Sequence, residues 1–577
     1  MVTAGNSGAI QPFGGAFALF DLGLPTSGTE TINSRFQYNN WYFAEFAQDD
    51  WKVLPNFTLS MGIRLIHETP VDESQNRQIA GFNSTAINAA TVQAEKNYAA
   101  APSSYLPAAS FQPVGGLYYA SPSQRNGYFP APLYWSPRVG FAYSPGFSHG
   151  TMAIRGGFGV YINPFNDYNA GQAYGYSATS TYVVSNLTNG NPTSTLQDPF
   201  DPNVNPIVQP YGSSLGVNTN LGSGIIYFAN VRVPYVEKGS IDIQKQFGRS
   251  WMVEVGYLTA HGVHYSYSNA ISSTPLLPYL SHQQTLDKTV TNNLTQAVTN
   301  PFKGLFPAAT TPNGVTVPNT TSLNTSSTIS VAQLLQAYPE YSSVTQQLVP
   351  GQNSSFNALT LRLEKRMSYG LQFNINYEYS RQLGAQSQLN PGGPLWYGET
   401  SSDFPQHLAA TVIYQLPFGR GRRFMNQSRL MDEIFGGYEV TSIYQFLSGT
   451  PISWGNVVYT GNFSDFNNHP HQANGQPSFN IANFDRTSAD QPNSYNFRTF
   501  PAYLLRSDGN NNFDFSVLKN FTLGEHMVLQ PRVDAFNALN HVQFSSANVS
   551  PTSSSFGVVN SQLNASRQLQ GGLHFIF

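Results

Sequence analysis

Apolar and polar side chains alternate with a period of two along many short segments of this chain. In the clearest pair, residues 359–364 and 371–379, leucine, phenylalanine, isoleucine and tyrosine hold one set of positions, and mainly threonine, arginine, asparagine and glutamate hold the other. Because successive side chains of a β-strand point to opposite faces, this pattern predicts strands with one apolar and one polar face. The short connection Met367–Gly370 joins the two segments, which predicts a hairpin.

The C-terminal segment Arg567–Phe577 has the same alternation and ends on an aromatic residue. Soluble domains seldom end on their most apolar strand, because chain termini usually lie in water. In a transmembrane β-barrel such a strand faces lipid, so we expect a closing strand here. Its end resembles the signal that outer-membrane barrels present to the barrel-assembly machinery, and we assign that role to Phe575 and Phe577. The alternative is the last strand of an ordinary β-sandwich.

Counted along the chain, the alternating segments predict about fourteen to sixteen strands of the ~9–11 residues that a tilted membrane-spanning strand needs. Ile225–Val233 is among them, and Phe13–Phe20 predicts the end of another strand. Between the strands lie polar stretches rich in Asn, Ser, Thr, Gly and Pro, chiefly 68–134, 165–222, 270–350 and 448–510. Compact soluble domains rarely hold structureless loops beyond ~12–15 residues, whereas the external loops of barrels are long. The pattern therefore predicts an all-β fold, an antiparallel transmembrane β-barrel with long extracellular loops.

Composition supports a membrane barrel over the other classes. Charged residues make up only 10% of the chain, against ~25% in ordinary soluble domains, yet hydrophobic residues reach only 40%. The 33 Tyr, 40 Phe and 6 Trp could supply aromatic girdles at the membrane surfaces. No stretch has the ~18 consecutive apolar residues of a spanning helix. The net charge of -3, without a basic block, gives no support for nucleic-acid binding.

No group of residues forms a credible catalytic or metal site. The chain has no cysteine, which removes disulfides, thiol catalysis and cysteine-ligated metals. Gly212–Gly216 matches the G-x-S-x-G string of a nucleophile elbow, but no strand precedes it and no helix is predicted after it. The pairs His261/His264 and His469/His471 lack a third ligand. The carboxylate pairs Asp49/Asp50 and Asp432/Glu433 could in principle do acid/base work or hold calcium, and for Asp49/Asp50 we expect a turn-capping role instead. We therefore expect neither an enzyme nor a bound cofactor.

Two sets of residues are candidates for function. The first set is charged and falls on the polar face of the predicted strands, where it would face the lumen and pair internally or with a domain inside the barrel, with substrate contact as the alternative. The second set is aromatic and is expected near the loops, where it would stack on a substrate, with membrane girdles as the alternative. The first set is Arg362, Glu364, Glu378, Arg532 and Asp534, and the second is Trp135, Trp396, Tyr397 and Trp454.

Several segments resemble TonB-dependent outer-membrane receptors, in particular the Oar-like group. They occur in the order of that family and span most of the chain. One difference is Gln406, which stands where the family more usually has a basic residue. The matching segments are Phe46–Val53 with Leu59–Arg64, Trp135–Tyr143, Ile154–Tyr161, Leu416–Arg422 and Arg532–His541.

The resemblance implies a barrel of about 22 strands with an internal plug, and energy delivered by TonB through an N-terminal box. This chain shows neither plug nor box, nor the family's carboxypeptidase-regulatory-like domain, and Met1–Asn6 does not begin a secretory signal. We therefore expect residues 1–577 to be the C-terminal part of such a barrel, truncated at its N-terminus.

The function that this resemblance implies is TonB-dependent transport or reception at the cell outer membrane. The substrate is unknown and could be a glycan, a peptide, a siderophore or a protein. The expected partners are outer-membrane lipid, the barrel-assembly machinery and, through the missing N-terminal part, the TonB complex. A passive outer-membrane pore, a surface adhesin on a barrel anchor and a secreted array of soluble β-sandwiches remain as alternatives.

Overall fold

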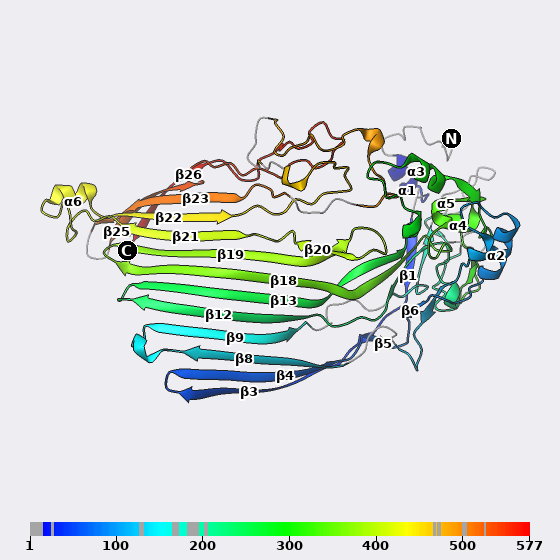
Figure 1. Ribbon diagram of the computed structural model, residues 1–577, viewed down its shortest axis with the longest axis horizontal. Helices are drawn as coiled ribbons and strands as arrows, with labels where there is room; N and C mark the ends of the chain where they lie inside the picture. The colour runs from blue at the N-terminus through cyan, green and yellow to red at the C-terminus, as the bar shows by residue number, and fades with distance from the viewer. Residues whose placement is uncertain are drawn as a thin grey trace.

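The computed structural model describes residues 15–577, except 25–27, 126–131, 164–171, 182–194, 201–205, 466–468, 470–474, 499–504 and 524–526. Its main feature is one 16-stranded sheet, drawn across the width of Figure 1. The long strands of this wall are β3 (Tyr42–Leu54), β4 (Phe57–Glu68), β8 (Leu133–Tyr143), β9 (Met152–Ile162), β12 (Tyr235–Phe247), β13 (Trp251–Ser272), β18 (Ser343–Ser368), β19 (Leu371–Gln388), β21 (Gln406–Gln415), β22 (Tyr438–Leu447), β23 (Asn510–Lys519), β25 (Val528–Phe536) and β26 (Gln568–Ile576).

The wall strands pair antiparallel with their neighbours in chain order, from β3 at one edge to β26 at the other. Three short strands extend the sheet: β11 (Gly224–Phe228), β20 (Leu395–Glu399) and β24 (Phe521–Thr522). Among the described pairings, none joins β3 to β26, so the sheet has two open edges. The predicted all-β antiparallel sheet is confirmed, while these pairings do not close it into a barrel.

Connections at the two ends of the wall differ in length. At the turn end they are mostly tight and include residues 55–56, 248–250 and 369–370. At the opposite loop end, long segments follow β4, β9, β13, β22 and β25, and they gather at one side of Figure 1 and along the top of the view. In outer-membrane barrels short turns face the periplasm and long loops face the exterior, so the turn end corresponds to the periplasmic side.

The strand register separates apolar from polar residues on the two faces. Leu361 and Phe575, on the apolar face, remain 40% and 51% exposed, so no second layer covers them. The aligned row on that face is Phe446, Leu408, Tyr377, Leu361, Val255, Ile243, Ile154, Tyr143 and Phe57. The next row, on the polar face, includes His407, Glu378, Thr360, Asp242 and Arg155. An uncovered apolar face opposite a charged face is the arrangement of a membrane barrel wall.

The loop end is more ordered than the sequence predicts. Segments after β4, β9 and β13 pack together into one hydrophobic core, which we call the loop core and which contains Tyr98, Phe111, Ile225, Phe302 and Tyr341. The same segments form α2 (Thr91–Ala100), α3 (Lys288–Thr295), α4 (Ser322–Thr325), α5 (Val331–Leu334) and the strand pairs β6 (Ile79–Asn83) with β7 (Gly116–Tyr119), β14 (Ala297–Thr299) with β17 (Thr328–Ser330), and β15 (Ala309–Thr310) with β16 (Thr316–Val317). The expectation of structureless loops is wrong here. Apolar residues from three separate segments pack against one another, although their spacing along the sequence shows no periodicity.

Two expected strands are also different in the structure. The part of Phe13–Phe20 that the structure describes belongs to helix α1 (Gly15–Asp21), while Phe13 lies outside the described residues. Ile225–Val233 contains no wall strand, and its first residues form β11, which pairs in parallel with the loop end of β18. Near the N-terminus, β1 (Thr29–Asn33) pairs with β10 (Ser177–Thr181), and β2 (Tyr38–Asn39) pairs with β5 (Asp72–Glu73). Within the described residues, no helix is long and apolar enough to cross a membrane.

Candidate functional site

The polar face of the wall brings three of the predicted charges close together. Arg362 and Glu364 lie two residues apart on β18, and the Arg362 guanidinium donates to Glu364 Oε2 at 2.9 Å. Arg366 approaches the other oxygen of Glu364 at 3.7 Å. Glu378 on β19 is aligned with Thr360, one step along the same face. Arg362 and Glu364 therefore pair with each other on the polar face.

This charged patch extends onto residues that the sequence analysis did not select. Glu254 on β13 is aligned with Arg362, and Asp242 on β12 is aligned with Arg155 on β9. Among the described residues Arg362 Nε is buried without a hydrogen-bond partner, while its Nη2 donates to Glu364. The period-two alternation, applied to every strand, would have found Asp242 and Glu254. Each is a charged residue whose two sequence neighbours are apolar and point to the opposite face.

The second predicted charge pair lies near the β26 edge. Arg532 Nε donates to Asp534 Oδ1 at 2.5 Å, and the Ser516 hydroxyl donates to the same oxygen at 2.6 Å. Asp534 is buried by these contacts. The Ser516–Asp534 hydrogen bond therefore joins β23 to β25 on the polar face, while the Arg532–Asp534 pair lies within β25. A ligand would find little of the carboxylate exposed.

A shallow depression of about 490 Å³ lies where β4, β8, β9 and β12 meet. Arg138 and Lys238 both contact the ring of Tyr161, at 4.6 and 5.4 Å from its centroid. Glycines such as Gly62 and Gly157 form part of its lining. The two cations over one ring make this part of the polar face suited to anionic groups.

The aromatic candidates lie in three different environments. Trp135 is within β8 rather than in a loop, and it is aligned with Leu65 on the apolar face. Its predicted loop position is wrong, and its exposed ring fits the membrane-girdle alternative. Tyr397 is on β20 at the loop end, where its hydroxyl shares a hydrogen bond with the Ser355 hydroxyl at 3.0 Å. Trp396 points to the other side of β20, and its Nε1 has no hydrogen-bond partner.

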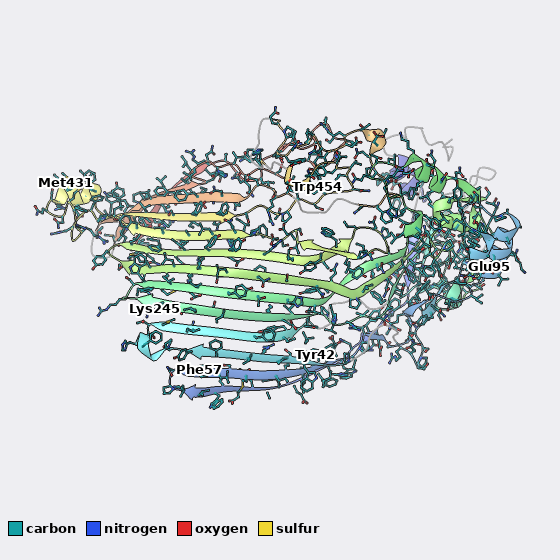
Figure 2. All side chains as sticks on the ribbon, in the orientation of Figure 1. Tyr42, Phe57, Glu95, Lys245, Met431 and Trp454 are labelled. Atoms are coloured by element: carbon teal, nitrogen blue, oxygen red, sulfur yellow. The ribbon has the colours of Figure 1, made fainter. Side chains whose placement is uncertain are left out.

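Trp454 belongs to a second hydrophobic cluster at the loop end, formed by segments after β22 and β25. Only 6% of the residue is exposed, and its ring stacks on Phe484 with centroids 5.2 Å apart. Phe479 and Phe556 contact the same ring edge-on. This packing is a correction to the expected surface position of Trp454 (labelled in Figure 2), because a buried ring cannot stack on a substrate.

The remaining chemical candidates are dispersed. Gly212–Gly216 forms a turn leading into a single 3-10 turn, without the strand and helix of a nucleophile elbow. His261 lies 3.6 Å from Glu237 on the neighbouring strand, and His471 lies outside the described residues. Within the described part of the chain, no group of three histidine, aspartate or glutamate residues could hold a metal ion.

One buried acid in the loop core was not predicted. Glu340 is fully buried, and within the described part of the chain neither of its carboxylate oxygens has a hydrogen-bond partner. Burial raises the pKa of this carboxyl well above its usual value. Tyr341 beside it is also buried, and its hydroxyl has no partner. Sequence alone gives no signal for this, because the polar stretch around Glu340 resembles any exposed loop.

Lysines and aromatic rings mark the turn end of the apolar face, and we call this set the turn-side belt. Lys245 donates to the Thr151 hydroxyl at 2.8 Å, and Lys365 donates to the carbonyls of Ser368 and Leu371, both at 2.9 Å. The other members are Trp251, which lies under Lys365, and Lys519 with Tyr438 and Phe521. Lys365 and Lys519 are buried, and their ammonium groups are bound to backbone carbonyls, so the belt stabilises the turns at this end of the wall.

Phe575 and Phe577, the proposed assembly signal, lie at this same end. Their ring centroids are 6.0 Å apart, and both side chains are exposed beside the β26 edge. Phe575 is aligned with Leu529 of β25, which lies on the apolar face, and Phe577 follows two residues later on the same face. Their role in assembly stays a prediction.

Comparison with solved structures finds receptors and transporters of outer membranes at low identity. FpvA from Pseudomonas aeruginosa, solved with pyoverdine, is 8% identical with a TM-score of 0.36, and the match covers 94% of this chain and 39% of that chain. The ferric-catecholate import receptor Fiu from E. coli is 8% identical with a TM-score of 0.37, over 93% of this chain and 45% of that chain. The outer membrane transporter YddB from E. coli is 9% identical with a TM-score of 0.36, over 94% of this chain and 54% of that chain.

This chain thus spans only 39% to 54% of the length of these three solved chains. No curated protein sequence matches it. A protein-family comparison matches the outer membrane beta barrel domain over residues 2–570, which is nearly the whole sequence. The chain therefore belongs to the outer membrane beta barrel domain family, whose members are barrels of the cell outer membrane and not enzymes.

Proposed function

We propose that this chain is the C-terminal barrel portion of a TonB-dependent transporter or receptor of the Oar-like group. The observation that carries the proposal is the two-faced wall. Its apolar face is uncovered along the row through Leu361, while the opposite face carries Arg362, Glu364, Glu378 and Asp242. A passage for polar cargo needs such a lining, because charges inside a membrane are placed toward water-filled or protein-filled space.

The segments that resemble the Oar-like group support the finer assignment. Phe46–Val53 and Leu59–Arg64 form the hairpin of β3 and β4, as that resemblance implies. Trp135–Tyr143 and Ile154–Tyr161 form the adjacent strands β8 and β9. Leu416–Arg422 lies at the turn end after β21. The resemblance therefore agrees with the positions of these segments in the wall.

Two parts of the molecule suit contact with cargo. On the polar face, Glu378 and the Arg138–Lys238–Tyr161 depression offer charges of both signs along one surface. At the loop end, Tyr397 offers an exposed ring, whereas the indole nitrogen of Trp396 is buried. These groups fit a glycan, a peptide, a siderophore or a protein equally well, so the proposal leaves the substrate class open among these four.

The proposal includes a longer parent protein. In it, a plug would fill the lumen and a preceding segment would contact the TonB complex, while the barrel-assembly machinery would insert the wall into lipid. The wide interior of a large transporter barrel requires such a plug. The unpaired edges of β3 and β26 are consistent with further strands in that parent.

Planar bilayers provide the test. We expect the intact parent to hold a bilayer nearly closed and to transport only with TonB, and the 577-residue chain to conduct or to fail to insert. If the chain conducts, Glu378→Arg should lower its preference for cations. Tyr377→Phe, one residue away on the apolar face, is the matched control and should leave selectivity unchanged.

Other results would favour the alternatives. A parent with large conductance that does not depend on TonB would be a passive pore. A 577-residue chain that inserts, stays closed and binds a ligand tightly would be a self-contained binding barrel or a surface adhesin on a barrel anchor. Either result would overturn the transporter assignment.

A further inference from the structure

The connection between β21 and β22 differs from the tight turns at the same end of the wall. It runs from 416 to 437 and contains helix α6 (Arg429–Phe435). Figure 1 shows α6 standing beyond the ends of the strands, at the opposite side of the molecule from the loop core. A helix in this position has no function in closing a hairpin, since two or three residues suffice for that elsewhere in the wall.

The apolar residues of α6 form one exposed stripe. Leu430, Met431, Ile434 and Phe435 are 70%, 45%, 54% and 43% exposed, and none of the helix residues is buried. Residues spaced by three and four positions share a face of a helix, so these four side chains project to one side. Figure 2 labels Met431 on this helix, clear of the sheet.

Polar contacts hold the helix in place, so the apolar stripe is exposed in a defined position. The Ser428 hydroxyl caps its N-terminus by accepting from the Met431 N–H at 3.5 Å. Asp432 Oδ1 accepts from the Arg420 N–H at 2.6 Å. A Cβ at Gly419 or Gly436 would collide with that same carboxylate, which makes glycine necessary at both positions.

A lysine of the turn-side belt ties the helix to the lipid-facing side of the wall. Lys519 is aligned with Tyr438 on the apolar face. Its ammonium donates to the carbonyls of Glu433 and Ile434, at 2.5 and 2.7 Å, and lies 4.6 Å from the ring centroids of both Tyr438 and Phe521. The C-terminal end of α6 therefore adjoins the surface that contacts lipid.

The turn that precedes the helix adds positive charge to the same connection. Arg420, Arg422 and Arg423 are exposed, and in the described part of the chain no carboxylate lies within ion-pair distance of them. Arg429 is the exception, because it pairs with Glu433 at 2.9 Å on the other side of the helix. An apolar helix stripe and exposed arginines in one short segment are typical of segments that lie in the interface of an anionic membrane.

We propose that α6 and its arginine-bearing turn bind the anionic phospholipid surface on the periplasmic side of the outer membrane. The stripe of Leu430, Met431, Ile434 and Phe435 enters the boundary between headgroups and acyl chains. Arg420, Arg422 and Arg423 bind headgroup phosphates. The helix thereby fixes the height of the barrel in the membrane, next to the lysines of the turn-side belt.

Because the natural chain has no cysteine, single-cysteine variants with a nitroxide label can measure depth in vesicles. Met431→Cys reports the stripe, and Arg429→Cys on the opposite side of α6 is the matched control. In vesicles of phosphatidylcholine with phosphatidylglycerol, we expect the Met431 label to be at least threefold less accessible to a water-soluble nickel chelate than the Arg429 label. In pure phosphatidylcholine the difference should shrink.

A triple variant with Arg420, Arg422 and Arg423 changed to Gln should keep the heat-modifiable folded form. In this variant phosphatidylglycerol should no longer increase the difference in accessibility between the labels at positions 431 and 429. Equal accessibility of both labels in anionic vesicles would overturn the proposal and favour a protein partner. Competition by inorganic phosphate at millimolar concentration would also overturn it, since that would indicate a free-phosphate site. If Met431→Cys does not fold, Leu430→Cys reports the same stripe, and a label at Leu573 confirms insertion of the wall.

Discussion

Replacing Glu340 with Gln should change how the stability of the loop core depends on pH. The carboxyl is fully buried without a hydrogen-bond partner, and burial raises its pKa well above the ordinary value of 4.5. Below that pH the carboxyl is protonated in both the folded and the unfolded loop core, so it carries no ionisation penalty. Above it the unfolded chain releases the proton first, and the folded state becomes less favourable.

The magnitude follows from linkage between protonation and folding. Between the unfolded and the folded pKa of Glu340, the free energy of unfolding should fall by about 1.4 kcal/mol per pH unit. It should level off once the pH passes the folded pKa. Glu340→Gln removes this slope, while its buried amide costs about 1–3 kcal/mol at every pH. Glu340→Met has neither a carboxyl that ionises nor a buried amide without a partner. Above pH 5 it should therefore be more stable than both the natural chain and Glu340→Gln.

Pulse proteolysis in urea, with the chain in lipid vesicles, measures the opening of the loop core while the wall stays inserted. Glu95→Gln on α2 is the control for a change of charge in the same part of the molecule, and Figure 2 shows Glu95 at the outer end of the loop core. Equal pH slopes for the natural chain and Glu340→Gln would show that the carboxyl is solvated or paired, and the reasoning would be refuted.

Three further predictions concern the wall and its loop end. Arg506→Gln should destabilise the second cluster by about 3 kcal/mol in urea-dependent proteolysis, because it leaves the buried Asp403 without its 2.5 Å ion pair. Leu361→Arg should cost about 2–4 kcal/mol in folding titrations in lipid, whereas Thr360→Arg on the polar face should cost far less. Deleting Phe575–Phe577 from the parent should reduce the heat-modifiable barrel in outer membranes, and unchanged assembly would exclude a terminal recognition role.

The wall could be predicted from sequence because its signal is local. In 371–379 the apolar and polar positions follow the pleat of β19 directly, and the aligned partners in β18 show the same split. The extent of a strand was not predicted where the alternation of apolar and polar residues ends. β18 begins at Ser343, well before the alternating residues at 359, because its loop-end half is paired but lies among polar loop segments.

The loop end could not be predicted because its contacts join distant segments. The ring of Trp454 is buried by Phe479, Phe484 and Phe556, and no spacing between these residues indicates that they meet. The same holds for Glu340, whose burial depends on segments that follow three different strands. An exposed aromatic residue and a core aromatic residue in an irregular loop have the same sequence pattern, so the substrate-contact prediction for Trp454 rested on residue type alone.

The open edges of the wall lead to the last prediction. Among the described residues β3 and β26 each have one edge without a partner strand. In hydrocarbon every unpaired backbone group costs several kcal/mol, so both edges must be paired in a membrane. If this chain is part of a larger barrel, cysteines at Ala47 on β3 and Gly571 on β26 should not cross-link in the parent, because other strands separate them. The aligned residues Ala535 and Leu569 provide the positive control. Efficient cross-linking of Ala47→Cys to Gly571→Cys would show that this chain closes by itself, and the larger barrel would have to be abandoned.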